Sequence, residues 1–164
     1  MRPDRPTDRA AMATAAIVGW VVAAILLATT AIAVALHRDA VQTALTRSVV
    51  RTNTGRRFST IEHASSIALT VGAVAAVLVV VVAAVGARNL WRNKRTGRTS
   101  LVLAAVLALA LAVGFWFALE PARADVEAAG IPGPLFWAVY VSAAIGLVST
   151  ALTFAPSVTV RLRD

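Results

Sequence analysis

The chain has 164 residues, of which 59% are hydrophobic, and its mean hydropathy is +0.76. A soluble domain is normally about 45–50% apolar, whereas the excess here is gathered in four uncharged runs, each long enough to cross about 30 Å of hydrocarbon. A water-soluble core is excluded, because helices that are apolar all round leave no polar face for water.

The formal net charge is +8, and the positive residues lie in the segments that flank the apolar runs. There they set topology and contact anionic lipid, and they lack the interleaved aromatic residues of a single-strand nucleic-acid groove. We therefore expect membrane lipids with anionic headgroups as partners, and no nucleic acid. The chain has no cysteine, which excludes disulfides, thiolate metal sites and thiol redox chemistry. We expect no cofactor.

Residues 1–10 are polar and contain two prolines, so a disordered cytoplasmic tail is predicted there. The first membrane helix is predicted over residues 11–36. A cleaved signal peptide is the alternative, since Ala31-Ile32-Ala33 fits the small-x-small cleavage pattern. The length of the run favours an uncleaved helix, because the apolar region of a signal peptide is only about 7–15 residues long.

A hydrophilic segment, residues 37–63, follows. Val41, Ala44 and Leu45 fall on one helical face together with Ser48 and Val49. This pattern predicts a short amphipathic helix in the first extracytoplasmic loop, lying on the outer membrane surface. The second membrane helix is predicted over residues 61–87, entering the membrane near residue 64.

The segment Arg88–Arg98 reads RNLWRNKRTGR and has no acidic residue. A short basic segment between two apolar runs is typical of a cytoplasmic loop. We expect its five cations to set topology and to contact anionic lipid: Arg88, Arg92, Lys94, Arg95 and Arg98.

The third helix is predicted over residues 100–119, with Ser100 as its N-cap. An acidic loop with a short surface helix separates it from the fourth helix, predicted over residues 134–155. A basic cytoplasmic tail, residues 157–164, ends the chain. The sequence therefore predicts an all-α membrane protein, an antiparallel bundle of four transmembrane helices.

The distribution of Lys and Arg predicts the orientation. Three precede the first run, five lie in the central segment and two in the C-terminal tail, which makes ten on one side against six on the other. The positive-inside rule then places both termini in the cytoplasm. The richness in Ala, Val and Arg favours a bacterium, and hence its plasma membrane.

No ionisable side chain falls inside the four apolar runs, although an ion-coupled transporter usually needs one there. His37 and His63 flank the first loop and could form a metal site or a pH switch; without a cluster of further ligands, we interpret them as interfacial residues. We expect no metal site and no catalytic residue.

Two ridges of small residues suit close helix packing. One lies on the third helix (Ala104, Ala108, Ala112) and the other on the fourth (Ser142, Gly146, Thr150). They fit packing within the bundle, which we favour, or a face on which a partner's helix docks.

Four segments carry a resemblance to a family: HRDAV after the first helix, FSTIEHA before the second, RNLWRNKRTGRTSLVL before the third and FAPSV after the fourth. In these four segments and in the order in which they occur, the chain resembles small four-helix membrane proteins of actinobacteria, most of which have no assigned function. The resemblance implies topology and no functional residue. Arg56 and Arg57 stand where related first loops tend to be acidic.

These features favour a non-enzymatic accessory or scaffold subunit of a larger membrane complex, which would hold its partners through small-residue ridges on the lipid-facing surface and the first loop. An oligomeric channel or transport component, built from copies of this chain, is the alternative. A membrane enzyme acting on lipid is the least supported, because no His, Asp and Glu constellation is present.

Overall fold

The computed structural model describes residues 6–52, 58–92, 94, 96–128 and 132–155. The elements in chain order are α1 (Pro6–Leu36), α2 (Arg38–Thr52), α3 (Phe58–Trp91), α4 (Thr96–Leu119), the 3-10 helix η1 (Glu120–Ala122), α5 (Arg123–Ala128) and α6 (Pro134–Leu152). Four of them contain stretches long and apolar enough to cross a membrane: Ala11–Leu36, Ser66–Trp91, Thr96–Leu119 and Pro134–Leu152. The protein is an all-α, multi-pass integral membrane protein, as predicted.

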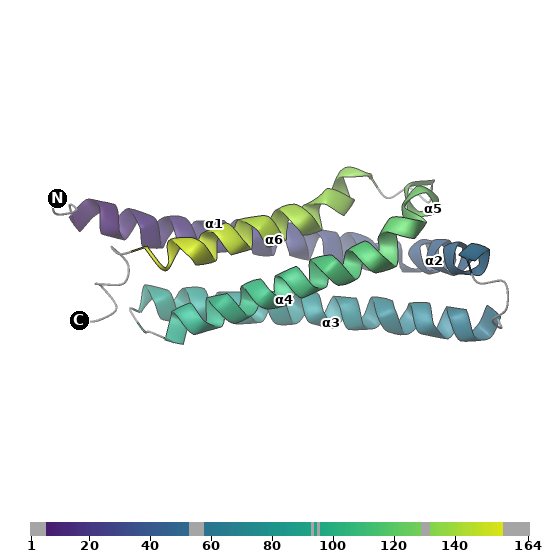
Figure 1. Cartoon of the computed structure of the whole chain (residues 1–164), viewed down its shortest axis with the longest axis horizontal. Helices are drawn as coiled ribbons and strands as arrows, with labels where there is room; N and C mark the ends of the chain where they lie inside the picture. Colours follow the sequence, from purple (N-terminus) through teal and green to yellow (C-terminus); the bar gives the residue numbers. More distant parts are fainter. Residues whose placement is uncertain (1–5, 53–57, 93, 95, 129–131, 156–164) are drawn as a thin grey trace.

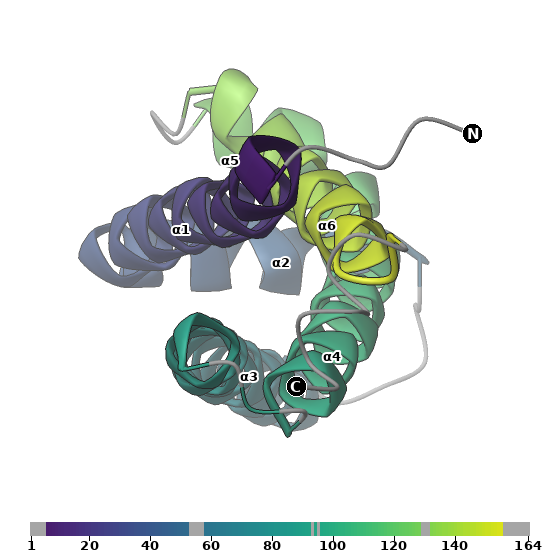
Figure 2. The ribbon, with the colours of Figure 1, turned by 90° about the vertical axis from the view of Figure 1, so that its left-hand side faces the viewer.

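The four long helices form a ring in which each contacts two others (Figure 2). The closest pairs are α1 with α6 and α3 with α4, and contacts of α1 with α3 and of α4 with α6 complete the ring. We call the end that holds the α3–α4 turn the basic end, after Arg88, Arg92, Lys94 and Arg98. The opposite end, which carries α2, η1 and α5, is the cap end (Figure 1).

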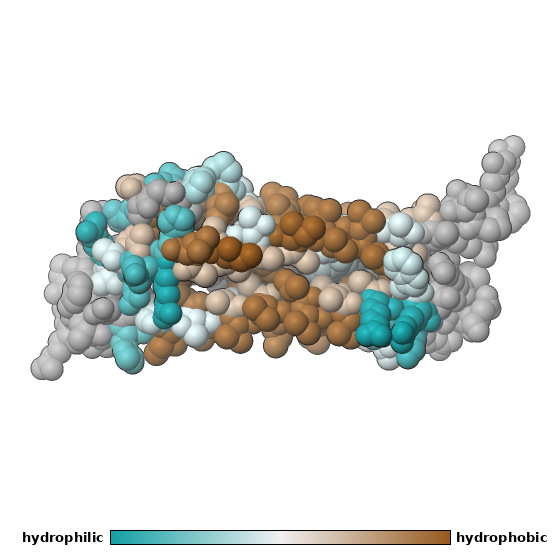
Figure 3. All heavy atoms as spheres, turned by 180° about the vertical axis from the view of Figure 1, so that it is seen from behind, coloured by the Kyte–Doolittle hydropathy of each residue, from teal (hydrophilic) through white to brown (hydrophobic). Residues whose placement is uncertain are grey.

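Apolar side chains cover the outside of the bundle between these two ends. In Figure 3 a hydrophobic band occupies the middle of the molecule, and hydrophilic residues gather toward both ends. Large apolar residues on all four long helices contribute to the band, among them Ile25, Val77, Val106 and Val148, each at least half exposed. Such a surface suits lipid and not water.

The observed helices differ from the predicted ones at several ends. α1 begins at Pro6, since proline suits the first turn of a helix, so residues 6–10 are helical and not part of a tail. Residues 1–5 and the tail predicted over 157–164 lie outside the described residues. α6 ends at Leu152, three residues earlier than predicted, where the Thr153 amide donates to the Thr150 carbonyl (3.0 Å).

The two helices extend further into the segment Arg88–Arg98 than predicted. α3 continues to Trp91 and α4 begins at Thr96, so only a few residues join them. Ser100 is therefore not an N-cap; its hydroxyl donates to the Thr96 carbonyl one turn back (3.0 Å). The turn fits because Gly97 has no side chain: a Cβ there would lie 2.5 Å from the backbone nitrogen of Leu90.

The amphipathic helix of the first loop is present as α2. Backbone hydrogen bonds from His37 to Ala33 (3.1 Å) and from Val41 to His37 (2.9 Å) link it to α1. Its apolar face packs against η1, α5 and the start of α6 instead of meeting the membrane surface. The buried cluster at this end comprises Val41, Ala44, Leu45, Leu119, Ala122, Val126 and Phe136. The side chains of Ser48 and Val49 lie outside the described part.

Two glycines provide a matched test of the hairpin. Gly97→Ala should lower the free energy of unfolding by about 1–3 kcal/mol, because the added methyl overlaps the backbone of α3. Gly114→Ala should cause no loss, since a Cβ at that position has no neighbour within 4 Å. Thermal unfolding in mild detergent, followed by circular dichroism, checks both variants. Equal melting temperatures would contradict the close approach at Gly97.

Candidate functional site

The two predicted ridges lie inside the bundle. Ala104 is fully buried, and the other five residues are at most slightly exposed: Ala108, Ala112, Ser142, Gly146 and Thr150. The first ridge belongs to the main core with Ala76 and Ala83 of α3. This burial agrees with the favoured interpretation, packing within the bundle. It does not fit the alternative of a lipid-facing surface that holds a partner, because neighbouring helices of the same chain already cover these residues.

The second ridge contacts α1 at short range. The indole of Trp20 lies over Gly146, where a Cβ would stand 3.0 Å from the ring. Gly19 faces Ser149, whose hydroxyl would lie 2.0 Å from a Cβ at Gly19. Slightly further along, the Ser142 hydroxyl donates to the carbonyl of Ala23 on α1 (2.8 Å). Small residues on both helices let the two backbones approach closely.

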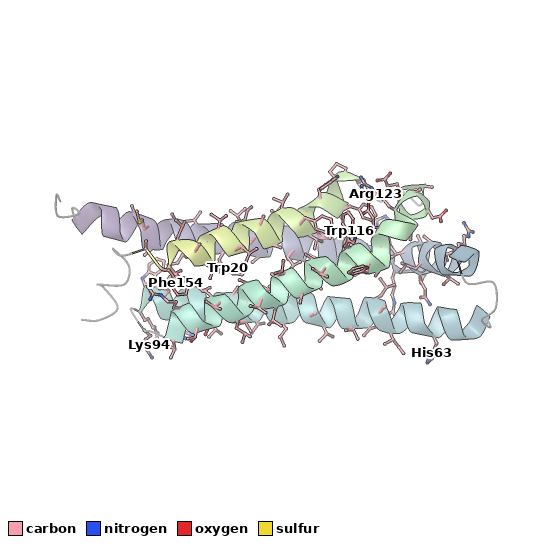
Figure 4. The ribbon with its side chains drawn as sticks, in the orientation of Figure 1. Trp20, His63, Lys94, Trp116, Arg123 and Phe154 are labelled. Carbon is pink, nitrogen blue, oxygen red and sulfur yellow. The ribbon has the colours of Figure 1, made fainter. Side chains whose placement is uncertain are left out.

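A buried chain of hydrogen bonds ties three helices together near the basic end. The Trp20 indole N–H donates to the hydroxyl of Thr150 (3.2 Å), and that hydroxyl donates to the carbonyl of Leu101 on α4 (3.4 Å). Trp20 is 3% exposed, and Figure 4 labels it beside α6.

Sequence reasoning did not single out Trp20. The sequence feature that could have identified it is a tryptophan within an apolar run, away from the membrane interfaces that this residue prefers. A buried indole N–H usually finds an acceptor, so the run itself indicated a polar partner on another helix.

The five cations of the central segment have different surroundings. The Arg98 guanidinium donates to the carbonyl of Thr153 at the end of α6 and lies 4.8 Å from the ring centroid of Phe154. A cation there suits the negative end of the α6 dipole. Arg88, Arg92 and Lys94 are exposed, and Arg95 lies outside the described residues. Figure 4 shows Lys94 and Phe154 at the same end of the molecule.

The cap end carries an aromatic cluster joined to a charged group. Tyr140 lies edge-on to Trp116 (5.9 Å between ring centroids) and to Trp137 (6.0 Å). The Arg123 guanidinium lies 5.6 Å from the Trp137 ring and bonds Glu127 at 2.9 Å. The hydrogen bond that Arg123 donates to the Glu127 carboxylate raises the pKa of Arg123 above its usual value. Trp116 and Arg123 lie near each other in Figure 4.

A groove of about 400 Å³, lined by alanines as well as polar and charged residues, opens between α2 and α5. Asp39, Thr43 and Arg47 line one side and Asp125 the other. Because α2 buries its apolar face in the cap cluster, its polar face is left toward this groove. Both signs of charge meet there, so the groove suits a polar surface that itself carries both.

Nothing in the described ranges brings three or more His, Cys, Asp or Glu side chains together as a metal site. The Nδ1 atom of His37 lies 3.1 Å from the Ala33 carbonyl, and His63 is exposed on α3. Comparison of the chain with protein-family models, with curated proteins and with solved structures finds no match.

The bond between Trp20 and Thr150 can be measured with a double-mutant cycle. Trp20→Phe and Thr150→Val should show a coupling of about 0.6–1.7 kcal/mol, the range found for hydrogen bonds between membrane helices. Unfolding in mixed micelles supplies the four free energies. The control cycle pairs Trp116→Phe with Thr150→Val and should give no coupling. A coupling free energy of zero in the first cycle would contradict the hydrogen bond between Trp20 and Thr150.

Proposed function

We propose that the chain is a non-enzymatic scaffold or accessory subunit of a larger complex in a bacterial plasma membrane. The observation that carries this proposal is the cap end, where α2 and α5 fold over their own apolar cluster and present a groove that carries both signs of charge. That arrangement supports a preformed docking surface, because the groove stands on elements whose apolar faces are already packed.

The bundle interior supports a structural role as well. Small residues, the Trp20 ring and hydroxyls that bond to neighbouring carbonyls fill the space between the helices. Interhelical contacts of this kind stabilise a fixed arrangement of helices. The resemblance to small four-helix membrane proteins of actinobacteria is part of the same proposal.

The proposed orientation places the basic end in the cytoplasm and the cap end outside. It is supported by the exposed cations of the α3–α4 turn, which has no acidic residue. Glu120, Asp125 and Glu127 all belong to the cap end. Short positively charged segments are retained on the cytoplasmic side.

Single cysteines can report the orientation, since the chain has none of its own. Thr43→Cys at the cap end should react with a membrane-impermeant maleimide in intact cells. Lys94→Cys at the basic end should react only after the cells are permeabilised. Gel-shift analysis reads both. Labelling of Lys94→Cys in intact cells would reverse the proposed topology.

Photo-crosslinking in living cells separates the subunit from the channel. A photoreactive amino acid at Arg47, on the edge of the groove, should give one discrete adduct with a different protein. The same amino acid at Val148, on the outer surface of α6, serves as the control and should not give that adduct. Mass spectrometry identifies the product. An adduct of twice 17.1 kDa at Arg47, with no other, would favour the homo-oligomeric channel and contradict the subunit.

A further inference from the structure

One face of α3 forms a continuous apolar stripe on the outside of the bundle. Val74, Leu78, Val81 and Val85 follow one another at intervals of four, three and four residues, so they lie on one side of the helix. Each is 48% to 61% exposed. The membrane-spanning part of α3 is also the least buried of the four membrane-spanning helices. Only 17% of its apolar stretch lies inside the bundle.

The stripe ends in two arginines. Arg88 comes three residues after Val85, and Arg92 four residues after Arg88, so the same spacing carries both guanidinium groups onto the same face. Both are exposed, and Trp91 beside them is 74% exposed. An indole at the end of an apolar stretch suits the level of lipid headgroups.

No acidic residue lies near Arg88 and Arg92 in the sequence of α3 and α4. No Asp or Glu occurs between Glu62 and Glu120, and those two residues belong to the opposite end of α3 and to η1 at the cap end. Arg98 already binds the end of α6, through a hydrogen bond to the Thr153 carbonyl and a cation–π contact with Phe154. Arg88 and Arg92 are exposed, and guanidinium groups are well suited to bind phosphate oxygens.

The part of the stripe from Leu78 to Arg88 matches one leaflet of a bilayer in length. Leu78 and Arg88 are ten residues apart, which is about 15 Å along a helix, or half of a hydrocarbon core of about 30 Å. A phospholipid whose phosphate lies at Arg88 would therefore reach Leu78 with its acyl chain.

We propose that this face of α3 is a binding site for an anionic phospholipid. The headgroup phosphate lies between Arg88 and Arg92, the glycerol region lies beside Trp91, and an acyl chain follows Val85, Val81 and Leu78. The site depends on shape and charge only, and not on the proposed partner complex or orientation.

A second copy of the chain is a less suitable occupant of the same stripe. Two copies inserted in the same direction and packed through this face would bring the arginine pairs of both chains together. Like charges placed opposite one another disfavour an interface, whereas an anionic headgroup neutralises them.

The test uses the full-length protein, delipidated in mild detergent and titrated with phosphatidylglycerol or phosphatidylcholine of the same chain length. Intact-protein mass spectrometry counts the bound lipids. The wild type should retain phosphatidylglycerol in preference to phosphatidylcholine. The variant Arg88→Gln/Arg92→Gln should lose about 25-fold of its affinity for phosphatidylglycerol, since each cation near an anionic headgroup contributes roughly fivefold. Its affinity for phosphatidylcholine should fall less, because the choline cation offsets the charge of that phosphate.

The matched control, Arg38→Gln/Arg47→Gln, removes the same charge from exposed positions at the cap end and should keep the preference. Glycerol phosphate, which has the headgroup chemistry and no acyl chain, should not displace the lipid. The proposal is overturned if the wild type shows no preference, if both double variants lose it equally, if Arg88→Gln/Arg92→Gln keeps it, or if glycerol phosphate displaces the lipid. A dimer that excludes phosphatidylglycerol overturns it as well. Equal melting temperatures of the variants establish that they are folded.

Discussion

The close approach of α1 and α6 is the contact on which the rest of the bundle depends. Within a bilayer, apolar side chains gain little by leaving lipid, so helices associate through tight packing and hydrogen bonds. Gly19 and Gly146 provide the space, and Ser142 and Thr150 provide the hydrogen bonds. The same Thr150 hydroxyl reaches α4, so this contact also holds the α3–α4 hairpin against the first pair.

The membrane-spanning helices could be predicted from the sequence because apolar length is a local property. The direction in which each helix faces is less local. The spacing of Ala104, Ala108 and Ala112 indicated one face, but small residues suit either an internal contact or a partner. The structure turns them inward, because the side chains opposite them belong to α3 of the same chain.

Contacts between distant segments explain the features that the sequence could not predict. Arg98 caps the carbonyl end of α6, 55 residues away, although nothing near Arg98 in the sequence indicates that partner. The apolar face of α2 looked suited to a membrane surface, and three of the residues predicted on it, Val41, Ala44 and Leu45, are buried there. Their actual neighbours include Val126, from the predicted short surface helix, and Phe136, from the start of the predicted fourth helix. The open cap groove follows from that packing.

The pairing of the first helix with the last has a consequence for biosynthesis. The hydrogen bond that Trp20 donates to Thr150 spans 130 residues of sequence, and the one that Ala23 accepts from Ser142 spans 119. While the ribosome is still making α3 and α4, α1 already lies in the lipid with its indole N–H lacking the acceptor that α6 will bring. The α3–α4 hairpin, joined by a few residues, can assemble at once. The order of synthesis therefore gives a half-built protein in which the hairpin is complete and the ring stays open until the final helix inserts.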